Sequence, residues 1–129
     1  LASRLRIPGE HRDLALLAAR HHTKVHRALE LRPGTLLELL ETTDAFRRPE
    51  RFADLLLACE ADARGRAGLE DRPYPQAEYL RRVHSVAAST SLTENERQGL
   101  AGPAIGAKLR EKRLAAIAAL RAGTKNEHP

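Results

Sequence analysis

Apolar residues recur at helical spacing along nearly the whole chain, and this feature restricts the fold more than any other. Between residues 9 and 29, Leu, Ala and Val side chains return at intervals of three, four and seven residues, which places them on one face of a helix. Residues that favour strands are few, whereas Leu, Ala, Arg and Glu, which favour helices, are abundant. The sequence therefore predicts an all-α fold of five to six helices.

Start and stop signals divide this pattern into separate helices. We expect helices at residues 9–29, 36–46, 49–66, 76–89 and 103–122. Thr35 with Glu38, and Thr93 with Glu96, have the spacing of capping boxes, in which a hydroxyl and a carboxylate satisfy free backbone N–H groups. Cys59 falls on the apolar stripe of the third helix, so we expect its side chain to be buried.

The helices are predicted to form two lobes in tandem. An apolar pair of helices gives way to an Arg-rich helix near residue 46, which suggests one lobe at 1–46 and a second at 47–122. Residues 123–129 read as a disordered tail. The chain begins at Leu1 without an initiator methionine, so we expect a piece of a longer protein.

Cysteine content and hydropathy bear on the compartment. Cys59 is the single cysteine, which excludes an intrachain disulfide and favours a reducing compartment. No run of eighteen apolar residues and no basic-then-apolar leader is visible. We therefore expect a cytoplasmic protein with no membrane span.

The charge balance favours a polyanionic partner. The chain carries 22 Lys and Arg against 17 Asp and Glu, a net charge of +5. Nucleic acid is the commonest polyanionic partner, although a charge of this size can also serve solubility alone. Aromatic residues make up only 3% of the chain, which argues against base stacking. Any RNA contact is therefore expected to reach the backbone and to depend on RNA shape.

One basic element lies at the end of the third helix. Glu60 with Arg64, and Asp62 with Arg66, are spaced four residues apart with the acid first, the favourable order for helical ion pairs. They could be two ordinary surface ion pairs, each of small effect. Alternatively, the acids could hold two planar guanidinium groups in place for phosphate recognition.

A second basic element lies on the last helix. Four cations cluster there, with Glu111 as the only acid beside them: Lys108, Arg110, Lys112 and Arg113. A solvated helix face is one explanation. Because acids do not balance the cations, we favour a surface that contacts RNA phosphates.

A histidine pair is the third candidate site. His22 and His26 are one helical turn apart, a spacing at which two imidazoles can share a metal ion. No carboxylate accompanies them in the sequence, so we expect no tightly bound metal and regard both as weak candidates. The sequence also shows no Gly-rich phosphate loop and no Ser-His-Asp order, and we assign no catalytic residue in this fragment.

Four stretches of the sequence resemble a known family. They are LRIPGEHRDLALLAARHHTKVH from Leu5, RRPERFADLLLACEADARGR from Arg47, DRPYPQ from Asp71 and GPAIGAKLREKRLAAI from Gly102. In this order they resemble the C-terminal region of the bacterial multifunctional CCA proteins, which are CCA-adding tRNA nucleotidyltransferases with an HD domain.

The resemblance implies a role within a larger enzyme. Residues 1–46 would be the C-terminal half of an HD-type subdomain, and residues 47–122 a helical RNA-binding arm. The fragment would position the tRNA acceptor end for CCA addition by an N-terminal catalytic domain of the same parent chain. Mg²⁺ and ATP or CTP would bind upstream, and no cofactor is expected in the fragment itself.

The resemblance also refines the site residues and leaves two alternatives. The basic elements of the third and last helices would together form one surface for the tRNA backbone. The family often has His-Asp where this chain has His22-Thr23, which argues against phosphohydrolase activity. One alternative is nevertheless a metal-dependent HD phosphohydrolase that uses His22 and His26. The other is a non-catalytic helical domain that binds protein.

Overall fold

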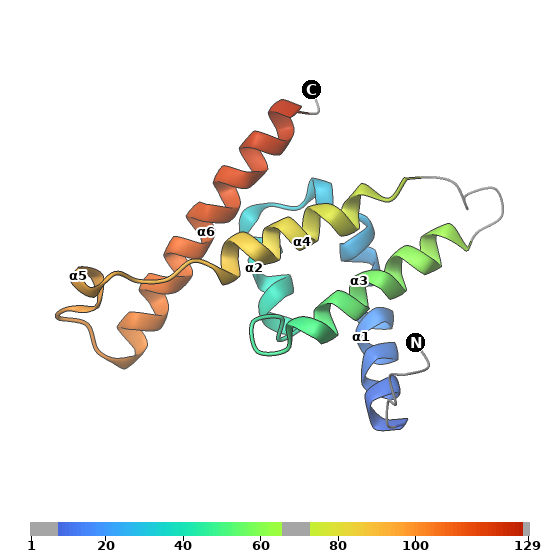
Figure 1. Cartoon of the computed structure of the whole chain (residues 1–129), viewed down its shortest axis with the longest axis horizontal. Coiled ribbons are helices and arrows are strands. Elements are labelled where there is room, and N and C mark those ends of the chain that lie inside the picture. The colour runs from blue at the N-terminus through green and yellow to red at the C-terminus, as the bar shows by residue number, and fades with distance from the viewer. Residues whose placement is uncertain (1–7, 66–72, 128–129) are drawn as a thin grey trace.

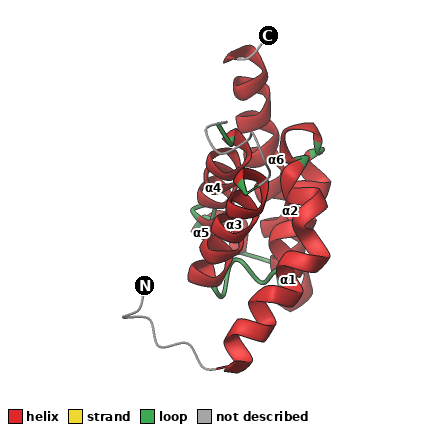
Figure 2. Cartoon of the chain, turned by 90° about the vertical axis from the view of Figure 1, so that its right-hand side faces the viewer, coloured by secondary structure: helices red, strands yellow, loops and turns green. Residues whose placement is uncertain are grey.

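Helices make up all the regular structure that is described (Figures 1 and 2). The computed structural model describes residues 8–65 and 73–127, with side chains at 12–65 and 73–124. The elements are α1 (Pro8–His26), the 3₁₀ turn η1 (Ala28–Glu30), α2 (Pro33–Thr42), α3 (Pro49–Arg64), α4 (Pro75–Ala88), α5 (Glu94–Arg97) and α6 (Gly102–Glu127). The predicted all-α fold is confirmed.

Prolines begin four of these helices, including α1, which starts at Pro8. Pro33, Pro49 and Pro75 each occupy the first turn of α2, α3 and α4, where the missing N–H costs no hydrogen bond and the fixed φ suits a helix. The second helix therefore starts before residue 36. This places Thr35 inside its first turn, and the predicted capping box of Thr35 with Glu38 is wrong.

The other predicted capping box is present at α5. The N–H of Glu96 donates to Thr93 Oγ1 at 3.1 Å, and the N–H of Thr93 donates to Glu96 Oε1 at 2.8 Å. Two backbone donors at the start of a four-residue helix are thus satisfied by side chains. The predicted box is confirmed.

The last helix is longer than expected. The sequence predicts a disordered tail from residue 123, but α6 continues to Glu127 and Thr124 is buried. Gly123 is tolerated within the helix at a cost of about 1 kcal/mol relative to Ala. Side-chain burial at Thr124 favours the extra turn, so the tail prediction is wrong for residues 123–127.

A single hydrophobic core joins the elements. α1 packs on α3, and α6 packs on both α4 and α2. The core contains Leu36 and Leu40 together with Phe52, Val83 and Ile117, so it includes side chains from both sides of the expected boundary at residue 46. Cys59 is buried in the same core, as predicted. The expected lobes therefore do not have separate cores in the described part of the chain.

The elements are spread along one long axis (Figure 1). The C-terminal end of α3 lies at the right of the view, whereas α5 and the N-terminal half of α6 lie at the left. α4 runs between these two ends. Among the described helices, none is both long enough and apolar enough to cross a membrane.

Candidate nucleic-acid interface

Arg110 forms an ion pair between helices. Its Nε donates to Glu41 Oε2 of α2 at 2.9 Å, and its Nη2 donates to Glu41 Oε1 at 3.2 Å. These hydrogen bonds and the charge of Glu41 raise the pKa of Arg110. The side chain remains 45% exposed. The guanidinium is thus held in one orientation at the surface, but by a carboxylate of the same chain.

Lys112 fastens α5 to α6. Its Nζ donates to the backbone oxygen of Ser91 and to Glu96 Oε1, both at 2.8 Å. The hydrogen bond from Lys112, with the one from the Thr93 N–H, lowers the pKa of Glu96 to about 2. Lys112 therefore holds the segment between α4 and α6 against α6, whether or not it also contacts RNA.

Arg113 packs inward. Its guanidinium carbon lies 3.8 Å from the centroid of the Phe46 ring, a cation–π contact, and its Nε donates to the backbone oxygen of Ala87 at 3.1 Å. Burial lowers the pKa of Arg113. This candidate residue joins α6 to α4 and to the segment before α3.

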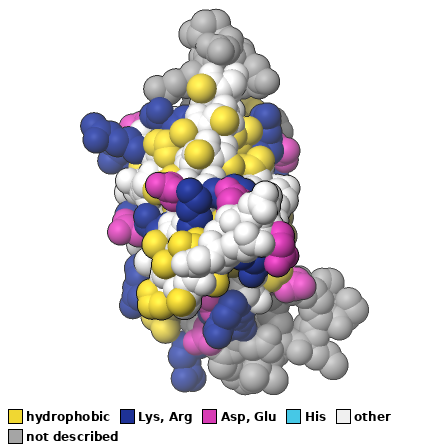
Figure 3. Space-filling view, turned by 90° about the vertical axis from the view of Figure 1, so that its left-hand side faces the viewer, with side chains coloured by type: hydrophobic (Ala, Val, Ile, Leu, Met, Phe, Trp, Pro, Cys, Tyr) yellow, Lys and Arg dark blue, Asp and Glu magenta, His cyan; other side chains and the backbone are white. Residues whose placement is uncertain are grey.

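Among the described side chains, Lys108 has one acidic partner, and it is local. Its Nζ lies 3.3 Å from Glu111 Oε1, three residues further along the helix, and its side chain is 42% exposed. The face in Figure 3 shows the same mixture, with Lys and Arg side chains alternating with Asp, Glu and apolar groups. Two of the four cations, Arg110 and Lys112, are therefore paired with acids contributed by other elements, which the sequence of the helix alone does not reveal.

The basic element at the end of α3 is described in part. Arg64 Nη2 lies 3.0 Å from Glu60 Oε2, so the predicted pair of Glu60 with Arg64 is confirmed. Arg66 lies outside the described residues. Its expected partner Asp62 lies 3.3 Å from His26 Nε2.

The two basic elements are far apart. α3 ends at Arg64 at one end of the long axis, and the N-terminal half of α6 lies at the other (Figure 1). A single tRNA surface that includes both elements would therefore have to extend over α4, which runs between them.

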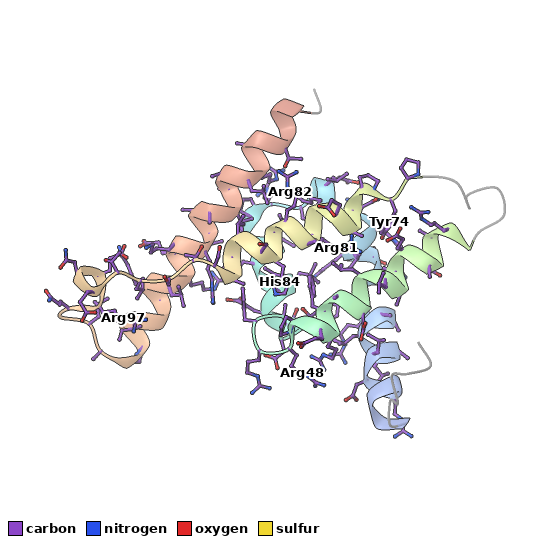
Figure 4. The ribbon with its side chains drawn as sticks, viewed as in Figure 1. Arg48, Tyr74, Arg81, Arg82, His84 and Arg97 are labelled. Carbon is purple, nitrogen blue, oxygen red and sulfur yellow. The ribbon has the colours of Figure 1, made fainter. Side chains whose placement is uncertain are left out.

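Sequence reasoning overlooked two cations on the central helix. Arg81 and Arg82 lie on α4, between the two basic elements (Figure 4). Arg81 approaches Glu78 at 3.6 Å and Glu60 at 4.0 Å. The available signal was an adjacent arginine pair in a helix whose only acid is Glu78.

The histidine pair is integrated into the fold. The rings of His22 and His26 have centroids 5.8 Å apart. His22 Nδ1 lies 3.0 Å from the backbone oxygen of Ala19, while His26 Nδ1 lies 2.6 Å from the Tyr74 hydroxyl. Asp62 approaches the other nitrogen of His26. Both ring nitrogens of His26 therefore have partners, and sequence reasoning missed Tyr74 and Asp62 because they lie 48 and 36 residues away.

A cavity adjoins this pair. It has a volume of about 300 Å³ and is lined in part by His22, Cys59 and Asp62. Burial, with the nearby charge of Asp62, raises the pKa of Cys59 to about 11, so the group remains a thiol at neutral pH. Within the described residues no three His, Cys, Asp or Glu side chains gather closely enough to hold a metal ion.

Curated proteins with similar sequences match almost the whole length of this chain. It is 56% identical over 122 residues, 95% of the chain, to the Multifunctional CCA protein of Thioalkalivibrio sulfidiphilus. The corresponding values are 54% over 117 residues for Nitrosococcus oceani and 52% over 121 residues for Xanthomonas euvesicatoria, 91% and 94% of the chain. The chain is homologous to the multifunctional CCA proteins.

The match defines how much of a CCA protein is present. The chain spans about 30% of the length of the relatives that it matches. A continuous match over 122 of 129 residues leaves seven residues unmatched at the two ends together. It therefore includes residues 8–122, however those seven are divided between the ends. The homology to CCA proteins thus covers the histidine pair and both basic elements. No family model matches the chain, and no solved structure matches it.

Proposed function

We propose that this chain is the tRNA-binding, partly HD-derived helical module of a cytoplasmic CCA-adding tRNA nucleotidyltransferase. The observation that carries the proposal is 52–56% identity to multifunctional CCA proteins across nearly the whole chain. Residues 1–46 form the C-terminal half of the HD-type subdomain, and residues 47–122 form the RNA-binding arm. The module positions the acceptor end for addition of CCA to the 3′ terminus.

The transfer chemistry is assigned to the upstream part of the parent enzyme. That part would bind Mg²⁺ and ATP or CTP, and the metal would stabilise the negative charge that develops on the phosphates. Nothing among the described residues of this chain is assigned to that step. The contribution of this chain is to orient the RNA, which lowers the entropy cost of bringing the 3′ end to the catalytic residues.

Exposed cations are the proposed contacts to tRNA phosphates. Lys108, Arg110 and Lys112 retain exposed surface on α6, and Arg64 does so on α3, with Arg66 as the further candidate. The acidic partners of these cations fix the side chains in defined orientations before RNA binds. When a phosphate binds, part of each ion pair must be broken. Arg113 contributes by anchoring α6 through Phe46 and Ala87.

The distance between the basic elements favours a large, structured RNA. Contacts at both ends of the long axis suit a folded tRNA better than a short strand (Figure 1). Few aromatic side chains are available for stacking, so the contacts are expected to follow phosphate positions rather than base identity.

A protein-interaction domain is the second candidate. Two large apolar side chains, Leu16 of α1 and Leu57 of α3, are exposed on the pair of helices that pack together. The internal pairing of the α6 cations also agrees with a structural role for those charges. The phosphohydrolase alternative has less support, because both nitrogens of His26 already have protein partners.

Comparison of two RNAs tests the proposal. The chain should retain a folded tRNA on a filter at concentrations where an unstructured 12-nucleotide RNA passes through. The same preference should hold for tRNAs of unrelated sequence, because backbone positions are shared. Equal binding of the two RNA classes, or no retention of either at low salt, would contradict the proposed function and favour protein docking.

A further inference from the structure

A second pocket lies away from the candidate cations and the histidine pair. It has a volume of about 330 Å³ and opens between η1, the start of α4 and the C-terminal part of α6. Its lining residues are Leu29, Pro75, Glu78, Tyr79, Arg82 and Thr124. The volume is near the lower end of the range for small-molecule pockets, so a single heterocycle fits better than a larger ligand.

Two hydroxyl groups in this pocket are buried without partners. The residues Tyr79 and Thr124 are only 4% and 8% exposed, and neither hydroxyl has a hydrogen-bond partner among the described residues. Buried polar groups in folded proteins are nearly always paired, because an unpaired one costs the free energy of its lost hydration. Both residues line the pocket, but the hydroxyl oxygens themselves are enclosed, so a ligand there would supply the missing partners after a small movement of these side chains.

Arg82 and Glu78 line the pocket, and Arg121 lies near it. Burial raises the pKa of Tyr79, while the charges of Arg121 and Arg82 act in the opposite direction, which places both guanidinium groups within electrostatic reach of the hydroxyl. Arg121 is fixed by a hydrogen bond from its Nε to the backbone oxygen of Leu31 at 2.8 Å. Glu78 also lies at the entrance, but its carboxylate is 3.6 Å from Arg81. An anionic group is therefore favoured beside the pocket.

We propose that this pocket receives one unstacked base of an RNA strand. The apolar surfaces of Leu29 and Pro75 would contact the base plane, and the hydroxyls of Tyr79 and Thr124 would bond its edge. Arg82 would lie near the adjoining phosphate. This inference rests on the proposed RNA-binding function and adds a base contact to it.

The chemistry of the two hydroxyls predicts weak discrimination among bases. A hydroxyl can donate one hydrogen bond and accept others, and it rotates to suit its partner. Adenine and cytosine edges both offer a donor beside an acceptor, so both can satisfy the pair. The pocket would thus hold a nucleotide in place without reading its identity.

A nucleotide titration followed by amide NMR tests the proposal. Cytidine and adenosine 5′-monophosphates should each give saturable shifts at Leu29, Tyr79 and Thr124, with similar affinities. Thr124→Val removes one unpaired hydroxyl at constant shape, so it should weaken both nucleotides roughly three- to ten-fold. Its thermal midpoint should stay unchanged or rise, because no hydrogen bond within the protein is lost. A purely structural role for Thr124 would not give these opposite effects.

A matched variant and a second substitution complete the test. Thr42→Val removes a hydroxyl that donates to the backbone oxygen of Glu38 at 2.9 Å, outside the pocket, and should leave nucleotide binding unchanged. Tyr79→Phe should weaken binding as Thr124→Val does. Absence of saturable shifts at the pocket, or equal nucleotide binding by all three variants and the parent chain, would overturn the proposal.

Parallel tRNA binding separates this inference from the proposed function. If tRNA binds but nucleotides leave the pocket unshifted, the pocket assignment fails and the proposed function stands. If nucleotides shift the pocket but tRNA does not bind, the proposed function fails, and the RNA occupant is overturned with it.

Discussion

Arg110 of α6 and Glu41 of α2, 69 residues apart in the chain, share two hydrogen bonds of 2.9 and 3.2 Å. The pair links two helices and at the same time occupies the Nε/Nη2 edge of the guanidinium, one of the edges that a phosphate would use. An RNA contact through this edge of Arg110 must therefore compete with a carboxylate of the same protein.

This competition predicts opposite effects of Glu41→Gln on stability and RNA binding. Loss of the exposed ion pair should lower the free energy of unfolding by about 0.2–1 kcal/mol. Release of the guanidinium should strengthen tRNA binding. Urea unfolding and a tRNA titration measure the two effects. Glu30→Gln is the matched control, because Glu30 is an exposed acid 3.2 Å from Arg27 and its removal changes the net charge equally. If both variants bind tRNA alike, Arg110 does not contact the RNA through the edge that Glu41 occupies.

A buried imidazole, His21, and a partly buried one, His84, predict a loss of stability in mild acid. Burial lowers the pKa of His84, although a ring N–H donates to the backbone oxygen of Ala45 at 3.0 Å. Burial, with the charges of Lys24 and Arg20, also lowers the pKa of His21. Both groups have folded pKa values below the unfolded value of about 6.5. Their contribution to stability is complete above that pH and declines below it, because the unfolded chain takes up protons first.

Urea unfolding at several pH values measures this effect. The free energy of unfolding should be nearly constant from pH 8.5 to 7.5 and should fall from pH 6.5 to 5.5. His84→Gln retains a hydrogen-bond donor but cannot titrate, so its decline over the lower interval should be smaller. An equal decline in the variant and the parent chain would show that His84 does not contribute.

Local signals account for much of the fold. Pro49 and Pro75 begin α3 and α4 within one residue of the predicted starts, and Thr93 with Glu96 caps α5 as the spacing indicates. The errors have local causes too. Pro33 starts α2 three residues early, and α6 extends beyond the predicted end at residue 122, where Thr124 is buried.

The candidate site was less predictable because its contacts are not local. Spacing rules describe neighbours on one helix, and so they gave the pair of Glu60 with Arg64. They carry no information on Arg113 packing over Phe46, which depends on how α6 crosses the earlier elements. They likewise gave no reason to place Tyr74 beside His26.

The histidine pair predicts a metal site that one substitution could complete. Thr23 Oγ1 lies 3.5 Å from His22 Nε2, so a carboxylate at this position would adjoin the imidazole. Addition of Zn²⁺ or Ni²⁺ should leave the thermal midpoint of the parent chain unchanged, and should raise that of Thr23→Asp. Thr23→Asp combined with His22→Ala should lose the increase. A metal-dependent rise in the parent chain, or measurable phosphatase activity, would favour the phosphohydrolase alternative.

The salt dependence of tRNA binding tests the central claim most directly. Each phosphate contact contributes roughly 0.7–0.9 to the slope of log affinity against log salt, because binding releases counterions. Lys108→Ala with Arg110→Ala should therefore weaken tRNA binding and reduce the slope by about 1.5. The matched control is Arg27→Ala with Arg47→Ala, which removes the same charge from two other exposed ion pairs. The account predicts a reduced slope for the first variant and the parent slope for the control. The account would be contradicted if both variants kept the tRNA affinity and salt slope of the parent chain, or if both lost affinity and slope equally.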